Sequence, residues 1–338
     1  MSNNFDKLLA IKGDSVVIYA SGTSRFAVCP DLGGRVFVDI AGQCPHRMDF
    51  ASISKPSSEF NNYGGGNFWP APEGGKFGFN YVGDTWRVQE AVNIQGFDLI
   101  SNTGESALME KKSEYVNRAG TVFTSKVKRA FRLCEPDFDI ISLKPKAVTA
   151  YETVDEFELL DKITTDQALV AAWTLEQFAA SETTTAFCIV DDPENAINYD
   201  FYDLPGERIQ CHPKGFTYKT DGGKAGQIGV KVSAKPCKIG FWDTANHMLC
   251  IRENLNVGPG VYFNIADNDQ PEGPYSAADC YSIFNSDPDM GAFELETIGS
   301  AGIIGDILLG SKLISRTSFA VFNDDKPIND FLKANLGL

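Results

Sequence analysis

The alternation of apolar and polar residues over residues 121–133 is the feature that most restricts how this chain can fold. In an extended segment, the apolar side chains fall on one face (Phe123, Val127, Phe131 and Leu133) and the polar ones on the other (Thr124, Lys126, Lys128 and Arg132). This period of two is typical of a β-strand with one buried and one solvated face. Short segments of the same kind, separated by glycine turns, recur along the whole chain.

About twenty such strand candidates follow one another, and only residues 327–336 look helical. The apolar stripe of that helix consists of Ile328, Phe331, Leu332 and Leu336. Neither a low-complexity linker nor a repeat of fixed period interrupts the pattern. We therefore predict an all-β fold, a large antiparallel sandwich or barrel that forms one domain over residues 1–338.

The net charge of −15 over 338 residues makes nucleic acid an unsuitable partner, because phosphates require a basic face. An anionic membrane surface is disfavoured for the same reason, and no run of about eighteen apolar residues is present to span a bilayer. The N-terminal segment MSNNFDKLLAIKGDS lacks the features of a secretory signal, so we expect a cytoplasmic location. A neutral or weakly charged small molecule fits this charge better.

The cysteines and histidines of the sequence form no motif that is typical of a metal site or a redox site. The eight cysteines include no C-x-x-C pair, and the chain has only three histidines, so no zinc site is indicated. Several cysteines lie in apolar strand patterns, as Cys188 does, and we expect them to be buried free thiols. The sequence therefore predicts no metal and no cofactor, and acid–base chemistry would depend on carboxylates.

The stretch NNYGGGNFWPAPEGGKFGFNY, residues 61–81, holds six glycines, two prolines and six aromatic residues, with Glu73 and Lys76 as its only charges. This glycine and proline content excludes a helix and disfavours a plain strand. A loop of this kind either forms the aromatic rim of a small-molecule pocket or closes the end of a sheet. We predict that it forms the rim of a site.

Three ordered stretches carry a resemblance to a known group of proteins. They are FWPAPEGG in the aromatic loop, residues 243–267 with a Pro-Gly turn before an aromatic strand, and residues 293–322 with FELETIGS and LLGSKLISRTSFAVF. Together they resemble the aldose-1-epimerase (galactose mutarotase-like) superfamily, in particular uncharacterised bacterial members with a W-x-x-P-E-G-G loop. The resemblance implies a two-sheet β-supersandwich with a carbohydrate ligand.

The resemblance also implies a histidine acid and a glutamate base, and the chain departs from that pattern. The corresponding strand, AAWTLEQFAA, has no histidine, and Glu176 falls within about a residue of that position. The turn that would carry the glutamate reads LLGSKLIS, with Lys312 and Leu313 in its place. Mutarotation by the usual pair is therefore not expected.

Three glutamates are the candidate catalytic residues. Glu73 lies among aromatic side chains, which would raise its pKa and suit an acid, unless its own turn holds it. Glu176 would face the ligand if the face that it shares with Thr174 lines the site; otherwise it faces solvent. Glu296 shares a face with Glu294, and the two could form an acid–base pair, bind hydroxyls or a cation, or lie on the wet face of an edge strand.

Carbohydrate binding requires aromatic faces for sugar CH groups and polar or charged groups for hydroxyls. The candidate ligand-binding residues are Trp69, Lys76, Trp86, Arg87, His247, Tyr262, Asn264 and Glu294. His247 is the histidine that lies within a stretch of resemblance, although a plain surface position in the turn before a strand is the stronger alternative.

Three functional hypotheses follow. The chain is a carbohydrate-active enzyme, such as a sugar epimerase, that uses carboxylates for acid–base catalysis. Alternatively, it is a non-catalytic protein that binds or senses a sugar. A structural module with a filled cleft is the third. The missing histidine and glutamate favour binding over ordinary mutarotation, whereas the remaining carboxylates are compatible with catalysis.

Overall fold

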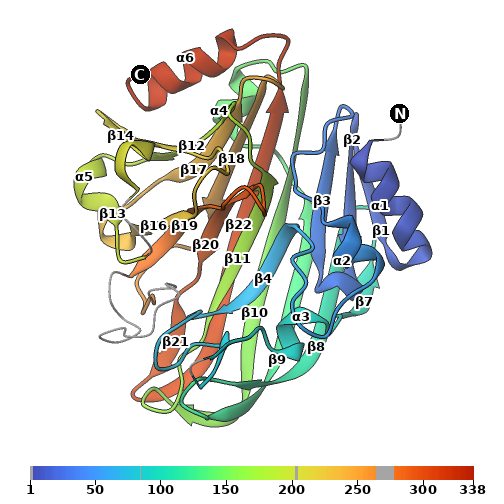
Figure 1. Ribbon diagram of the computed structural model, residues 1–338, viewed down its shortest axis with the longest axis vertical. Helices are drawn as coiled ribbons and strands as arrows, with labels where there is room; N and C mark the ends of the chain where they lie inside the picture. The colour runs from blue at the N-terminus through green and yellow to red at the C-terminus, as the bar shows by residue number, and fades with distance from the viewer. Residues whose placement is uncertain (1–2, 84, 202–204, 264–277) are drawn as a thin grey trace.

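The computed structural model describes residues 3–83, 85–201, 205–263 and 278–338 (Figure 1). Within these residues, two large antiparallel sheets face each other, and most apolar side chains are buried between them. The described strands of the first sheet are, in spatial order, β1 (Val17–Ser21), β2 (Ser24–Cys29), β3 (Arg35–Ile40), β4 (Gly65–Ala71), β11 (Ala171–Ala179), β20 (Ala292–Ile298), β19 (Asp279–Asn285), β16 (Gly226–Lys231) and β13 (Ile197–Asn198).

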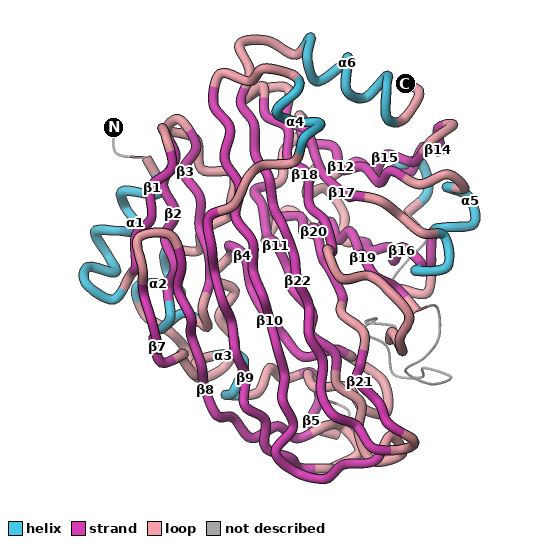
Figure 2. The backbone as a smooth tube through the Cα atoms, turned by 180° about the vertical axis from the view of Figure 1, so that it is seen from behind, coloured by secondary structure: helices cyan, strands magenta, loops and turns pink. Residues whose placement is uncertain are grey.

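The second sheet contains the longest strands, which lie side by side in Figure 2. Its described strands are β14 (Ile209–His212), β15 (Gly215–Lys219), β12 (Thr184–Ile189), β17 (Lys238–Asp243), β18 (Met248–Asn254), β22 (Ile307–Val321), β10 (Ala147–Thr164), β9 (Val122–Leu133), β8 (Ser106–Val116) and β7 (Asp98–Asn102), with β21 (Ala301–Ile304) paired to β22. A separate hairpin joins β5 (Tyr81–Val82) to β6 (Thr85–Trp86). The predicted all-β antiparallel sandwich is confirmed.

The helices are short (Figure 1), and one of them adds Ala91 and Val92 to the core between the two sheets. They are α1 (Asn4–Lys12), α2 (Phe50–Ser54), α3 (Glu90–Asn93), α4 (Phe138–Ser142), α5 (Pro193–Ala196) and α6 (Lys326–Asn335), with 3₁₀ turns at Gly13–Ser15, Pro30–Leu32, Gly206–Arg208 and Val232–Ala234. The predicted C-terminal helix is α6, and its apolar stripe packs against side chains such as Phe187 and Leu249 on the outer face of the second sheet.

Helix α1 was not expected from the strand pattern. The Asn3 side chain caps it by accepting a hydrogen bond from the Asp6 N–H, as residues of this type commonly do. Its buried residues Phe5 and Leu8 pack on Phe37 of β3, together with α2. The two helices therefore cover the outer face of the sheet beside β4.

Strand β9 shows why the two sheets pack. Its side chains are alternately buried and partly exposed, as the period of two predicts. Phe131 contacts Phe26 of β2 across the core, with the ring centres 5.7 Å apart, and Phe26 lies 5.8 Å from Tyr151 of β10. These pairs join the first sheet to the second, and burial of such aromatic side chains is a main source of stability.

The expectation of a loop over residues 61–81 is wrong for its central part, because β4 is a buried strand of the first sheet. Its glycines allow close approach: a Cβ on Gly66 would lie 2.8 Å from a Glu176 carboxylate oxygen. Pro70 is tolerated because β4 pairs with β3 only at Gly66, so the missing N–H of Pro70 interrupts no ladder on that side. The residues after β4 form the predicted loop.

None of the helices in the described part of the chain combines the length and the apolar character that crossing a membrane requires. The eight cysteines are free thiols, four of them buried: Cys29, Cys188, Cys250 and Cys280.

Candidate functional site

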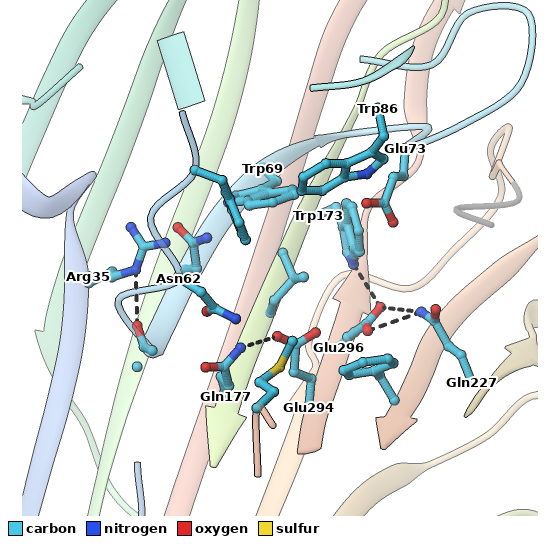
Figure 3. Close-up of a pocket in the computed structure, with 17 residues that line it drawn as sticks. Arg35, Asn62, Trp69, Glu73, Trp86, Trp173, Gln177, Gln227, Glu294 and Glu296 are labelled. Carbon is cyan, nitrogen blue, oxygen red and sulfur yellow. Dashed lines mark hydrogen bonds between the residues drawn. The ribbon is translucent and has the colours of Figure 1, made fainter. Parts of the chain in front are cut away.

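A pocket of about 220 Å³ lies on the face of the first sheet that is turned away from the second sheet (Figure 3). Five neighbouring strands, β4, β11, β20, β19 and β16, form its floor, and loops form its rim. This volume is below the ~300–1,000 Å³ of sites for drug-sized ligands and suits one small molecule.

The strand register explains why the floor residues share one face. Trp173 of β11 lies opposite Trp69 of β4. On its other side, β11 places Leu175 opposite Glu296 of β20, and Gln177 lies opposite Glu294 in the same way. Side chains alternate along a strand, so positions 173, 175 and 177 face the pocket and the positions between them face the second sheet.

Glu294 and Glu296 form the polar centre of the floor. Gln177 Nε2 donates a hydrogen bond to Glu294 Oε1 at 2.7 Å. Trp173 Nε1 donates to Glu296 Oε2 at 2.9 Å, and Gln227 Nε2 donates to Glu296 Oε1 at 3.1 Å. Strand β20 lies between β11 and β19, so the two glutamates are not on an edge strand.

Burial raises the pKa of both carboxyl groups. The pKa of Glu296, which is 1% exposed, lies well above its usual range because of burial and the neighbouring charge of Glu294. Burial also raises the pKa of Glu294, although the hydrogen bond from Gln177 acts in the opposite direction. Two like charges this close do not ionise independently, so the pair retains a proton above the pH at which an ordinary glutamate loses it.

Aromatic side chains form one wall of the pocket. The ring centre of Phe60 lies 6.2 Å from that of Trp69 and 5.2 Å from that of Trp86, and Trp69 lies 5.9 Å from Trp173. Trp86 is at the rim and is 39% exposed. Trp69 is 7% exposed, and its indole nitrogen has no hydrogen-bond partner within the described residues. A buried N–H without a partner is costly and is suited to an acceptor on a ligand.

Glu73 and Arg35 contribute charge from opposite sides of the pocket (Figure 3). Glu73 follows β4, and Asn80 Nδ2 donates to its Oε1 at 2.9 Å. The Arg35 guanidinium of β3 donates to the carbonyl oxygens of Gly64 and Leu32, at 3.0 and 2.7 Å. Burial lowers the pKa of Arg35 to about 9, which leaves it protonated at neutral pH.

Among the described residues, no three histidine, cysteine, aspartate or glutamate side chains are grouped so that they could hold a metal ion. The chemistry that the pocket itself offers is proton transfer by carboxyl groups, hydrogen bonding by amides and indoles, and contact with aromatic faces.

Five of the residues predicted from the sequence come together in this pocket. They are Glu73, Glu294, Glu296, Trp69 and Trp86. Their roles in catalysis or binding stay predictions, but their position on one cavity surface is what those roles require.

Glu176 lies elsewhere, on the opposite face of β11. It is 1% exposed and is held between the sheets by Arg252, whose NH1 donates to Oε2 at 2.9 Å, and by His46, whose Nε2 lies 2.7 Å from Oε1. The Tyr151 hydroxyl also donates to Oε1. Burial would raise the pKa of Glu176, but Arg252 and His46 bring it down to about 2. Glu176, which we expected to face either a ligand or solvent, therefore does neither in this pocket, because the face of β11 that lines the pocket is that of Trp173.

The described residues that line the pocket do not include four other predicted ligand-binding residues, which are Lys76, Arg87, His247 and Tyr262. Lys76 is exposed and lies over the Phe77 ring, and Arg87 is exposed beside another hollow. His247 lies in the turn between β17 and β18, paired with Asp325 at 2.7 Å. The buried Tyr262 bonds to Gly258. Asn264 lies outside the described residues.

Sequence reasoning missed Trp173, Gln177 and Gln227, whose side chains hold the two floor glutamates. The alternation within WTLEQF places Trp173 and Gln177 on a common face, and that signal was available. Gln227 is brought to Glu296 by the pairing of β16 with β19, for which the sequence has no local signal.

Comparisons with known proteins agree with the architecture. The profile of a family of unknown function (DUF6786) matches residues 4–305. The crystal structure of a putative aldose 1-epimerase from Escherichia coli K12 has 14% identity and a TM-score of 0.50, covering 90% of this chain and 98% of its own. A galactose mutarotase related enzyme from Lactobacillus acidophilus has 10% identity and a TM-score of 0.50, covering 91% of this chain and 99% of its own.

No curated protein matches the chain. The structural likenesses show a galactose mutarotase-like fold and confirm the resemblance that the three sequence stretches indicate.

Proposed function

The chain belongs to a family of unknown function (DUF6786), and we propose its function from the residues of the pocket. The protein binds a carbohydrate over β4, β11 and β20 and interconverts the anomers of that sugar. The observation that carries the proposal is the glutamate pair on the pocket floor. Glu294 and Glu296 are side by side, hydrogen-bonded and raised in pKa. The aromatic wall and the unpartnered indole N–H of Trp69 suit a polyhydroxylated ligand.

Anomeric interconversion requires two proton transfers. One group removes the proton of the anomeric hydroxyl while another donates a proton to the ring oxygen, and the bond between the anomeric carbon and the ring oxygen breaks. Rotation of the resulting aldehyde and ring closure return both protons. A carboxyl pair that shares one proton contains a donor and an acceptor at once, so Glu294 and Glu296 could supply both without a histidine.

The fold likeness supports the same reaction class. The two crystal structures with a TM-score of 0.50 are described as a putative aldose 1-epimerase and a galactose mutarotase related enzyme. At identities of 14% and 10% the likeness concerns the fold, so the reaction is argued from the residues of this pocket.

A binding protein without catalysis is the second candidate. The observation that favours it is the hydrogen bonding of the glutamates, because Trp173, Gln177 and Gln227 already donate to them. Such bonds fix the carboxylates as acceptors for ligand hydroxyls.

NMR saturation transfer between the anomeric protons of free sugars separates the two candidates. We expect the wild-type protein to accelerate transfer for at least one sugar in a panel of hexoses and pentoses. Glu296→Gln should abolish the acceleration, because it removes one partner of the shared proton. The exposed Glu114→Gln on β8 is the matched control and should retain it.

Saturable sugar binding without accelerated transfer would support the non-catalytic candidate. Acceleration that persists in Glu296→Gln would contradict the assignment of the glutamate pair.

A further inference from the structure

A different glutamine donates to each of the two glutamates on the pocket floor. Gln177 Nε2 donates to Glu294 Oε1 at 2.7 Å. Gln227 Nε2 donates to Glu296 Oε1 at 3.1 Å, and Figure 3 shows the two glutamates between these two amides. A half turn of a glutamine amide exchanges its NH2 group for its carbonyl oxygen. The orientation of each amide therefore decides whether the neighbouring carboxyl group meets a donor or an acceptor.

The orientation of the Gln177 amide is fixed by Arg47, which lies in the segment between β3 and α2. Arg47 NH1 donates to Gln177 Oε1 at 3.3 Å. A guanidinium has only donors, so a turned amide would lose this bond and bring its NH2 group against Arg47. The NH2 group of Gln177 therefore stays toward Glu294. A carboxylate accepts from this group, whereas the O–H of a protonated carboxyl finds no acceptor on it.

The amide of Gln227 is not fixed in this way. Its Nε2 also donates to Ser282 Oγ, at 2.9 Å. A hydroxyl both donates and accepts, so Ser282 satisfies either orientation of the amide. After a half turn, the Gln227 oxygen accepts from the O–H of a protonated Glu296. The pocket floor therefore accommodates a proton on Glu296 better than one on Glu294.

The backbone around Arg47 holds its side chain, which is 19% exposed. Its Nε donates to Met290 O at 2.9 Å, and its NH1 also donates to Asn62 O at 2.9 Å. A Cβ on Gly64 would lie 1.9 Å from Arg47 O, so the chain packs tightly against this residue. The described residues that line the pocket include Gln177 but not Arg47. Arg47 therefore acts on the pocket through Gln177.

The charges near Glu294 favour its ionised form. Burial raises the pKa of Glu294, and the hydrogen bond from Gln177 acts against this rise. The positive charges of Arg35 and Arg47 act against it as well. Asp49, whose Oδ2 lies 3.8 Å from Arg47 NH2, offsets part of the charge of Arg47.

The charges near Glu296 favour its protonated form. After burial, the negative charge of Glu294 is the largest cause of its raised pKa, and the charge of Glu73 acts in the same direction. Asp287 and Asp289, in the loop before β20, are exposed. The charges thus agree with the orientation of the two amides.

We propose that Arg47 is a positioning residue, which acts through Gln177 to keep Glu294 ionised. The shared proton of the pair then resides on Glu296. The inference rests on the proposed function and assigns its two roles. Glu294 removes the proton of the anomeric hydroxyl, and Glu296 donates its proton to the ring oxygen as the bond between that oxygen and the anomeric carbon breaks. Ring closure reverses both transfers, so the pair ends in its initial state.

Carbon-13 NMR of the full chain, labelled at the glutamate carboxyl carbons, tests the proposal without any sugar. The resonances lost in Glu294→Gln and in Glu296→Gln identify the two groups. We expect Glu294 to ionise at a lower pH than Glu296 in the wild type. In Arg47→Gln, the midpoint of the Glu294 titration should rise by about one pH unit or more. Gln177→Met, which removes the amide and keeps Arg47, should also raise it.

Arg132→Gln is the matched control, because Arg132 pairs with Glu152 at 2.8 Å and its side chain is 61% exposed. It should leave the midpoints of Glu294 and Glu296 unchanged. If Arg47→Gln does not fold, Gln177→Met alone decides the test. A role of Arg47 in stability alone would lower the unfolding free energy and leave the midpoint of Glu294 where it is in the wild type.

The outcomes separate this inference from the proposed function. Ionisation of Glu296 before Glu294, or a midpoint of Glu294 that neither variant moves, overturns the role of Arg47 even if the protein interconverts anomers. If the wild type accelerates transfer between anomers, the acidic limb of its pH profile should move to higher pH in Arg47→Gln. Shifted midpoints without accelerated transfer for any sugar overturn the anomer interconversion and leave the control of Glu294 by Arg47 standing.

Discussion

Glu176 on β11 and Glu296 on the neighbouring strand β20 have pKa values that are shifted in opposite directions, because the two side chains project from opposite faces of the first sheet. Glu176 faces the second sheet, where Arg252 and His46 bring the pKa of this buried carboxyl down to about 2. Glu296 faces the pocket, where burial and the charge of Glu294 raise its pKa. Val38 N–H donates to His46 Nδ1, so the other ring nitrogen, Nε2, donates to Glu176. The first glutamate forms a buried ion pair, and we propose that the second takes part in proton transfer.

Replacement of Glu176 should destabilise the protein without altering the pocket floor. Glu176→Gln leaves the buried Arg252 without a countercharge, and breaking a buried pair of this kind costs about 3–5 kcal/mol. Chemical denaturation measures this loss. Glu158→Gln is the control, since Glu158 pairs with Lys128 at the surface, and we expect a change within about 0.5 kcal/mol.

The ion pair between Glu176 and Arg252 also makes the stability of the protein depend on pH. Because the folded pKa of Glu176 is about 2, below its ordinary value of 4.5, its contribution to stability is complete above pH 4.5 and is lost as the pH falls toward 2. Equal stabilities of Glu176→Gln and wild type at neutral pH would contradict this account.

Glu296 should have the opposite effect on stability. Its folded pKa is raised above 4.5, so the folded protein retains a proton that the unfolded chain releases, and stability falls as the pH rises above 4.5. Glu296→Gln removes this penalty. As the pH rises from 4.5 to neutral, we expect the unfolding free energy of Glu296→Gln to increase relative to that of the wild type. Denaturation at each pH measures this difference. If the unfolding free energies of the two proteins changed in parallel with pH, the pKa of Glu296 would not be raised in the folded protein.

At the level of elements, strand β4 connects the buried ion pair to the pocket. One face carries Asn67 and Trp69 into the site, while Gly66 on the other lies against Glu176. The glycine-rich composition suggested a loop, because glycine and proline usually weaken strands. In this strand the Glu176 carboxylate packs where a Cβ of residue 66 would be. This contact joins segments that are distant in the sequence, so the local sequence cannot indicate it.

A methyl group at Gly66 tests this connection. The added Cβ in Gly66→Ala would lie 2.8 Å from Glu176 Oε2, so β4 must shift, at a cost of about 1–3 kcal/mol. We expect lower thermal stability together with weaker sugar binding through displaced Trp69. Gly104→Ala is the matched control, because nothing lies within 4 Å of its Cβ. A Gly66→Ala protein with wild-type stability and affinity would disprove the connection.

For the whole molecule, the period of two and the near absence of helix were sufficient to predict the sandwich, since half-buried strands repeat locally. The pocket was only partly predictable. Glu294, Glu296 and the aromatic residues stand out in the sequence. Which face of β11 lines the pocket with them depends on which face of β11 the second sheet covers, and the sequence does not indicate this. Both sheets take strands from both halves of the chain, and we propose on this ground that residues 1–338 form a single domain.

The most direct test of the carbohydrate site uses the tryptophans of the protein. Of the four, Trp69, Trp86 and Trp173 line the pocket and Trp242 does not. A Trp242→Phe protein therefore reports on the pocket through its remaining fluorescence. Titration with the panel of hexoses and pentoses should give a saturable change for at least one of them, with a weaker apparent affinity when Trp69→Ala is added. No saturable change with any sugar, or an affinity that Trp69→Ala leaves intact, would contradict the assignment of this pocket.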